Sequence, residues 1–189
     1  MSDNTSTRLG LRRVVQTVLA TPRGGVYEPG NTGNCQQAAL ASALDMDLDD
    51  VPHFVDYPVG YDPDADPLVE EHGALWYRAC RRWLRAGNAP HGRPLDLMGQ
   101  DPGEVARWLG HPSNDDAWPL HALASVQSPR GDFTHAVVLD RHGHIAWDPH
   151  PAQNAYGLEV IAEEIICAPY DPAPPDPDPW AEDLIAASV

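Results

Sequence analysis

TGNCQQAALASAL, residues 32–44, is the stretch of sequence that decides the fold. Its glycine turn delivers Cys35 to the start of an alanine-rich segment, and this pattern predicts a helix that packs closely against a sheet at the centre of the molecule. The N-terminus of a helix presents backbone N–H groups and partial positive charge, which stabilise a thiolate. Cys35 is therefore a candidate nucleophile. The alternative is an ordinary buried cysteine, and a partner histidine is needed to separate the two interpretations.

The composition of the chain narrows its possible partners. The sequence has 189 residues, 42% of them hydrophobic, which predicts one domain with a substantial core. All 12 basic residues are arginines and 28 residues are acidic, so the formal net charge is −16. Because nucleic-acid phosphates need neutralising cations, we expect no nucleic-acid partner, and a neutral or cationic substrate fits better. The apolar run at 14–20 is too short to span a bilayer, so we also expect no membrane partner.

The three cysteines indicate neither a disulfide scaffold nor a zinc ribbon. Cys35, Cys80 and Cys167 are odd in number, widely spaced and without a CxxC pair. We therefore expect a reducing compartment, the cytoplasm. Cys80 lies on the apolar stripe of an amphipathic helix, which predicts a place for it in the core.

The order of predicted elements indicates an α+β fold with an antiparallel sheet. Helices are expected at 35–44, within 45–54, at 67–85 and at 105–109 after the start signal at 101–104. Strands are expected at 12–19, 94–98, 118–127, 133–139 and 144–148, with one or two more in 157–168. Residues 1–9 are expected to be disordered, 10–170 to form the domain, and 171–189 to form an extended tail rich in proline and aspartate.

The predicted hairpin at 133–148 brings a histidine and a carboxylate together. His135 lies near the start of one strand and Asp148 at the end of its antiparallel neighbour, so both fall at the same end of the ladder. A carboxylate beside a histidine fixes its tautomer and stabilises the imidazolium, which lets the ring accept a proton from a nearby thiol. If Cys35 faces this hairpin, the three residues form a catalytic trio.

Five short motifs stand out along the chain: GNCQQA at 33–38, VPHF at 51–54, SPRG at 128–131, HAVV at 135–138 and DPHP at 148–151. Their order, with a cysteine that opens a helix, then a histidine on a strand and an aspartate after the next strand, resembles that of the papain-like cysteine peptidases and amidases. Taken together, the motifs are similar in particular to a group of small, largely uncharacterised bacterial and bacteriophage proteins with a papain-like core, over residues 14–166 approximately.

The resemblance implies a papain-like fold, in which the antiparallel sheet packs against a central helix that carries the nucleophile. It also implies roles for the trio: Cys35 as nucleophile, His135 as general base and acid, and Asp148 as the residue that orients the imidazole. The location it implies is the bacterial cytoplasm, or the host cytoplasm if a phage encodes the protein.

The sequence departs from the papain-like pattern at the oxyanion-stabilising residue. That residue is usually a glutamine a few positions before the nucleophile, whereas Asn31 and Asn34 stand there in this chain. Gln16 is the other candidate, with the loop at 21–33 as an insertion between it and Cys35, and we favour Gln16 over Asn31. An amide donor of this kind, with the Cys35 backbone N–H, typically contributes on the order of 3 kcal/mol to transition-state stabilisation.

A metal site is the competing interpretation of the histidine-rich end of the hairpin. His142, His144 and His150 lie near Asp148, and imidazoles with a carboxylate can bind zinc. However, His142 and His144 flank a turn glycine, where exposed side chains are normal. We therefore expect neither a metal nor another cofactor, and His150 is a candidate for the rim of the site.

Three functions are compatible with these residues. The first is a hydrolase that attacks an amide, peptide or isopeptide carbonyl and forms a thioester acyl-enzyme. The second is an acyltransferase of the transglutaminase type, in which an amine replaces water. The third is a catalytically silent interaction module. For the hydrolase, we expect the substrate to be a peptide or a small amide. The sequence leaves open the identity of the substrate, the oligomeric state, and the roles of the acidic loop at 45–71 and of the tail.

Overall fold

The computed structural model describes residues 11–19, 33–54, 69–109, 121–128 and 133–167, except for the side chains of 69–75 and 91. The predicted disordered terminus, the tail at 171–189 and most of the acidic loop lie outside the described residues. The helices are α1 (Cys35–Leu44), η1 (Leu48–Asp50), α2 (Val69–Arg85), η2 (Pro90–Gly92) and α3 (Glu104–Leu109). The strands are β1 (Asp96–Gln100), β2 (Ala122–Gln127), β3 (Thr134–Leu139), β4 (Ile145–Trp147) and β5 (Val160–Cys167).

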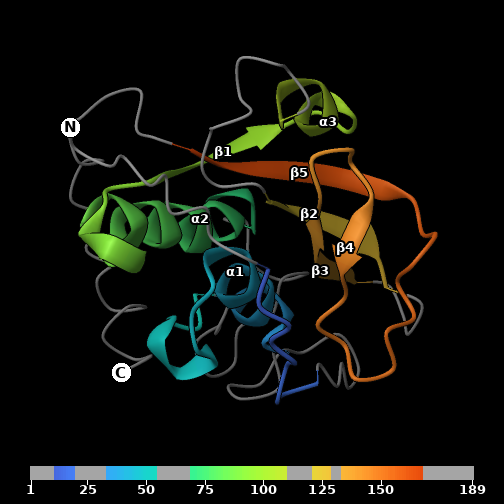
Figure 1. Ribbon diagram of the computed structural model, residues 1–189, viewed down its shortest axis with the longest axis horizontal. Coiled ribbons are helices and arrows are strands. Elements are labelled where there is room, and N and C mark those ends of the chain that lie inside the picture. Colours follow the sequence, from blue (N-terminus) through green and yellow to red (C-terminus); the bar gives the residue numbers. More distant parts are fainter. Residues whose placement is uncertain (1–10, 20–32, 55–68, 110–120, 129–132, 168–189) are drawn as a thin grey trace, which may run out of the picture.

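The five described strands form one antiparallel sheet in the order β1-β5-β2-β3-β4. Strands β2, β3 and β4 follow one another through short connections, whereas β5 returns to lie between β1 and β2. Figure 1 shows α1 and α2 on one side of this sheet and α3 on the other. The α+β class and the antiparallel sheet are therefore confirmed, and the described part of the region at 157–168 contains one strand, β5.

Helix α1 is the buried centre of the molecule, as its small side chains predict. Every residue from Ala38 to Leu44 is inaccessible to solvent, including the polar Ser42. The helix packs on β3 and β2, and its alanines let it lie close to them. Its neighbours in this core include Phe54 and Trp83, whose rings meet edge to face with centroids 5.8 Å apart. Because the core surrounds α1 beyond its first turn, the position of Cys35 is fixed by packing.

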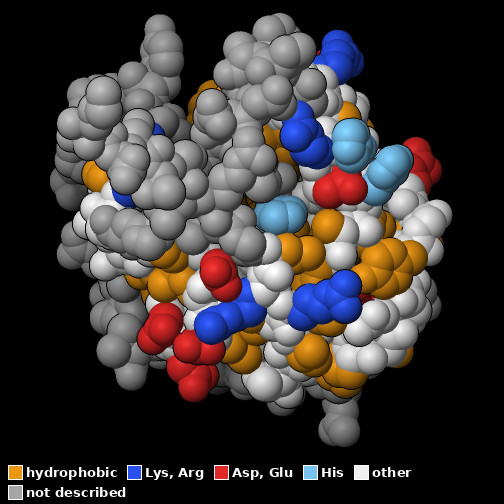
Figure 2. Space-filling view, viewed as in Figure 1, with side chains coloured by type: hydrophobic (Ala, Val, Ile, Leu, Met, Phe, Trp, Pro, Cys, Tyr) orange, Lys and Arg blue, Asp and Glu red, His pale blue; other side chains and the backbone are white. Residues whose placement is uncertain are grey.

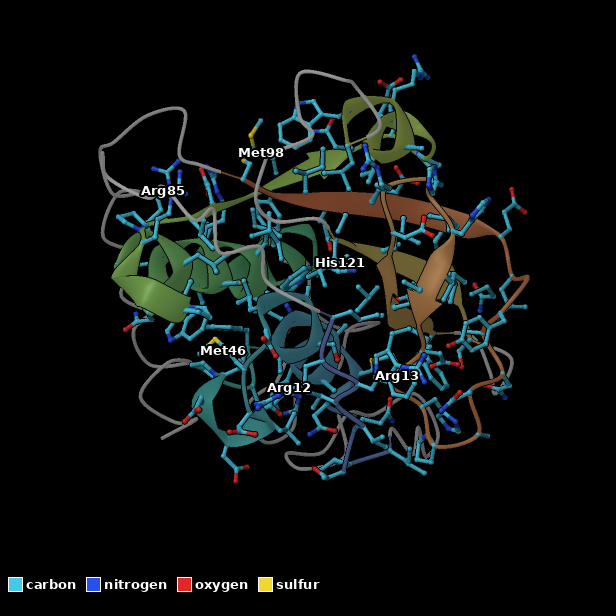
Figure 3. The ribbon with its side chains drawn as sticks, viewed as in Figure 1. Arg12, Arg13, Met46, Arg85, Met98 and His121 are labelled. Atoms are coloured by element: carbon cyan, nitrogen blue, oxygen red, sulfur yellow. The ribbon has the colours of Figure 1, made fainter. Side chains whose placement is uncertain are left out.

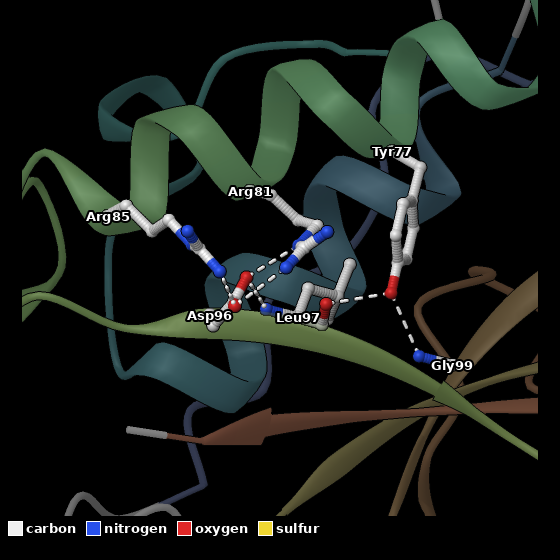
Figure 4. A network of polar contacts seen from close by, with 6 residues as sticks. All are labelled: Tyr77, Arg81, Arg85, Asp96, Leu97 and Gly99. Atoms are coloured by element: carbon white, nitrogen blue, oxygen red, sulfur yellow. Dashed lines mark hydrogen bonds and ion pairs between the residues drawn. The ribbon is translucent and has the colours of Figure 1, made fainter. Parts of the chain in front are cut away.

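Helix α2 is held to the edge strand β1 by a polar network (Figure 4). Arg81 binds the carboxylate of Asp96 through two hydrogen bonds, of 2.6 and 2.8 Å, and Arg85 donates a third. The Tyr77 hydroxyl donates to the Leu97 carbonyl at 2.7 Å and accepts from the Gly99 N–H at 2.9 Å. The helix predicted at 67–85 is thus confirmed, and its arginines face a buried acid as well as solvent.

Neighbouring glutamates on β5 serve opposite faces of the sheet. The Glu163 carboxylate accepts the N–H groups of Gly103 and Val105, each at 3.0 Å, and so caps the start of α3. A residue 60 positions away in sequence thereby stabilises the helix start that was predicted from its local signals. Glu164 points to the other face, where burial raises its pKa to about 7.

The N-terminal segment, residues 11–18, is not the strand that its β-branched residues predict. Its polar groups bind α1 and the end of β4 instead of a neighbouring strand. The Arg12 and Val14 N–H groups donate to the carbonyl and hydroxyl of Ser42, each at 3.2 Å. The Val14 carbonyl accepts from the Trp147 indole at 2.8 Å. The segment therefore ties the central helix to the sheet edge.

Two neighbouring arginines of this segment, Arg12 and Arg13, form contacts with other parts of the protein at its surface. Figure 3 shows Arg12 directed toward η1 and Arg13 toward β4, where its guanidinium lies 5.5 Å from the centre of the Trp147 ring. Arg12 pairs with Asp47 at 2.7 Å and lies 3.6 Å from Asp45. In Figure 2, acidic side chains gather at the lower left of the drawn face, beside basic ones.

Candidate active site

The hairpin of β3 and β4 brings His135 and Asp148 into contact. His135 is the second residue of β3, and Asp148 directly follows β4, which pairs with β3 through Val138 and Trp147. Their side chains form a hydrogen bond of 2.7 Å between Nε2 and Oδ1. This contact is the one that the hairpin pattern predicts, because antiparallel pairing places the start of one strand beside the end of the other.

Asp148 is fully buried and held in place by backbone donors. Its Oδ1 also accepts the His150 N–H, and its Oδ2 accepts the Ala155 N–H, both at 2.8 Å. Burial by itself would raise the pKa of Asp148, but the hydrogen bonds from His135 and from these N–H groups outweigh it and lower the pKa. The carboxylate is therefore ionised at neutral pH and fixes the orientation of the imidazole.

Cys35 lies on the other side of the His135 ring. The two side chains are hydrogen-bonded, and since Nε2 is occupied by Asp148, the nitrogen left for the thiol is Nδ1. Burial alone would lower the pKa of His135, but its bonds with Asp148 and Cys35 raise the pKa to about 9. At neutral pH the ring is thus an imidazolium that lies between a carboxylate and a sulfur.

The three cysteines differ in accessibility. Cys35 is partly exposed at the start of α1, whereas Cys80 and Cys167 are buried in the two cores. Burial raises the pKa of both Cys80 and Cys167, which disfavours the thiolate that reacts with electrophiles. Among the three, only Cys35 combines access to solvent with a histidine partner.

The candidate oxyanion donors fall in different parts of the chain. Gln16 is buried in the N-terminal segment, where its N–H donates to the Pro149 carbonyl at 3.0 Å and its side-chain amide donates to the Val18 carbonyl at 3.2 Å. Val18 in turn binds Asn34, the residue before Cys35. Gln16 is therefore linked through Val18 to Asn34, and directly to Pro149, the residue after Asp148. Asn31 lies outside the described residues.

The other histidines of the hairpin do not gather around a metal position. The Asp140 carboxylate accepts the N–H groups of His142 and His144, at 2.8 and 3.0 Å, and so closes the turn. The His150 ring packs edge to face on His135, with centroids 6.0 Å apart. Within the described ranges, no three His, Cys, Asp or Glu side chains are placed to hold a metal ion. His150 thus borders the candidate site.

Comparison with known proteins adds no assignment. No protein-family model, curated protein or solved structure matches the chain significantly. No helix in the described part of the chain has the length and apolar character needed to cross a bilayer.

The charge state of His135 gives a pH prediction. We expect the ring to titrate with an apparent pKa near 9, and Asp148→Asn to lower that value by about one unit or more, because the carboxylate no longer favours the imidazolium. While Asp148 stays ionised, the raised pKa of His135 therefore contributes stability that is fully present below about pH 6.5 and is lost as the pH rises through 9.

NMR titration of the His135 ring measures both values. A His135 ring that titrates near 6.5 in both proteins would contradict the ion-pair arrangement.

Proposed function

We propose that the protein is a papain-like thiol hydrolase that cleaves an amide, peptide or isopeptide bond through an acyl-enzyme. One observation carries the proposal: the His135 ring is hydrogen-bonded to Asp148 through Nε2 and also to the Cys35 thiol. This arrangement supplies a nucleophile, a proton carrier and an orienting carboxylate in one place. The partial exposure of Cys35 at a helix N-terminus supports the same function.

In the proposed reaction, Cys35 acts as the nucleophile and His135 carries the proton. The Cys35 thiolate attacks the carbonyl carbon, and the oxyanion that forms is stabilised by the Cys35 backbone N–H and the Gln16 amide. The His135 imidazolium then gives its proton to the leaving amine as the C–N bond breaks, which leaves a thioester. Neutral His135 removes a proton from water as the water attacks the thioester, and the thiolate leaves. An amine in place of water would give acyl transfer through the same three residues.

Competitive labelling with iodoacetamide tests the proposal directly. We expect Cys35 to be alkylated on the order of 100-fold faster than Cys80 or Cys167, because only Cys35 is accessible and paired with an imidazolium. Peptide mapping after short exposures measures the three rates in one sample of the folded protein. Equal rates for all three cysteines would contradict a catalytic thiol and favour an interaction module.

A further inference from the structure

We infer that Asn34, the residue before Cys35, is a positioning residue that sets the Gln16 amide relative to the thiol. The inference rests on the proposed function, because it concerns the stabilisation of the oxyanion in that reaction. Asn34 is 3% exposed, and its side chain makes four hydrogen bonds to three residues of the described chain.

The side-chain amide of Asn34 is fully used inside the protein. Its Oδ1 accepts the N–H groups of Thr17 and Val18, at 3.0 and 2.9 Å. Its Nδ2 donates to the Thr17 hydroxyl at 3.1 Å and to the Gln37 Oε1 at 3.0 Å. Because an amide nitrogen carries two hydrogens, no donor remains for a substrate oxyanion. Asn34 can therefore act on the reaction only through the residues that it holds.

One of those residues connects Asn34 directly to Gln16. The Val18 carbonyl accepts two hydrogen bonds, from the Asn34 backbone N–H at 3.1 Å and from the Gln16 Nε2 at 3.2 Å. Asn34 thus binds the Val18 N–H through its side-chain oxygen and the Val18 carbonyl through its own backbone N–H. The same carbonyl orients the Gln16 amide. The second hydrogen of that Nε2 stays available for an oxyanion.

The Gln16 amide is left incompletely paired in this arrangement. Its Oε1 is buried and has no hydrogen-bond partner, although an unpaired buried acceptor is normally unfavourable. If the amide were turned over, Oε1 would face the Val18 carbonyl oxygen, and the two acceptor oxygens would repel each other. The orientation is therefore enforced by Val18, and a group held at such an energetic disadvantage is typical of functional sites.

Both ends of this chain of contacts are anchored to the rest of the fold. The Gln37 side chain, which binds Asn34, donates to the Leu48 and Val51 carbonyls at 3.1 and 2.6 Å. At the other end, the Gln16 N–H donates to Pro149, next to Asp148. Asn34 therefore couples the nucleophile's helix to the oxyanion donor while the donor is held beside the orienting carboxylate.

The experiment compares two reactions of Cys35 in matched variants. Acylation by p-nitrophenyl acetate forms an oxyanion, whereas alkylation by iodoacetamide does not. We expect Gln16→Ala to slow acylation about 100-fold and Asn34→Ala to slow it about 10-fold or more, with alkylation within about 3-fold of wild type in both. The double variant should be no slower than Gln16→Ala, because both changes remove the same interaction.

Ser42→Ala is the control variant. It removes another hydrogen bond between the N-terminal segment and α1, that of the Val14 N–H to the Ser42 hydroxyl at 3.2 Å, but leaves the contacts of Val18 intact. It should lower stability without changing the ratio of acylation to alkylation. Asn34→Asp is a second test that does not depend on Asn34→Ala folding: it keeps the bond from the Val18 N–H to Oδ1 and the bond from its own N–H to the Val18 carbonyl, so the ratio of acylation to alkylation should stay within about 3-fold of wild type, and a selective loss of acylation would contradict the route through Val18.

The outcomes separate the inference from the proposed function. Equal losses of acylation and alkylation in Asn34→Ala, or effects of Asn34 and Gln16 that multiply in the double variant, would show a structural role only and overturn the inference. A wild-type Cys35 that reacts with neither reagent would overturn the proposed function itself.

Discussion

Replacement of Cys35 by alanine should lower turnover of any substrate by at least about 1,000-fold while leaving the fold intact. The sulfur is the only group in the proposed reaction that forms a covalent bond to the substrate, and neither His135 nor Asp148 can replace it. The fold should survive because Cys35 is partly exposed and the buried part of α1 begins after it. Hydrolysis of p-nitrophenyl acetate measures the loss, and far-UV circular dichroism checks the fold.

Cys167→Ala is the matched control for this prediction. Cys167 ends β5 and contributes to the second core, so its truncation removes a thiol of the same size from a place without a histidine partner. The control should keep wild-type turnover, with a small loss of stability. Turnover that persists in Cys35→Ala would exclude Cys35 as the nucleophile.

The sequence predicts the candidate site where the site depends on local patterns. The ladder of a hairpin relates His135 to Asp148 through a turn of a few residues, and a glycine turn before small residues indicates the start of α1. The contact between His135 and Asp148 and the start of α1 can both be predicted without knowledge of the rest of the fold. That Cys35 faces the hairpin could be stated only as a condition, because the packing of α1 on β3 joins residues 100 positions apart.

The N-terminal segment shows why other parts of the fold could not be predicted. Val14 and Val18 favour a strand by residue type, but their polar groups find partners on Ser42, Trp147 and Asn34. None of these partners is close in sequence, and without them the local preference was the only guide. The contacts of Asn34 are hidden from the sequence in the same way, because its amide binds Thr17 and Val18 on one side and Gln37 on the other.

Loss of the buried acid Asp96 should destabilise the fold strongly. Its side chain is 2% exposed and binds Arg81 and Arg85, which are themselves mostly buried. Burial would raise the pKa of Asp96, but the two arginines lower it to about 2. Asp96→Ala leaves both guanidinium groups without this carboxylate and should lower the free energy of unfolding by about 3 kcal/mol, near the lower end of values for broken buried ion pairs because Arg81 retains some exposure.

Urea denaturation of Asp96→Ala and of Asp47→Ala separates burial from simple pairing. Asp47 forms a similarly short ion pair with Arg12, at 2.7 Å, but its side chain is 77% exposed. Asp47→Ala should therefore lower the free energy of unfolding by less than about 1 kcal/mol. The contribution of Asp96 should be present above pH 4 and disappear as the pH falls toward 2, because its folded pKa lies below its unfolded value of 3.8. Equal losses in the two variants would mean that the contact between α2 and β1 does not depend on the buried charge.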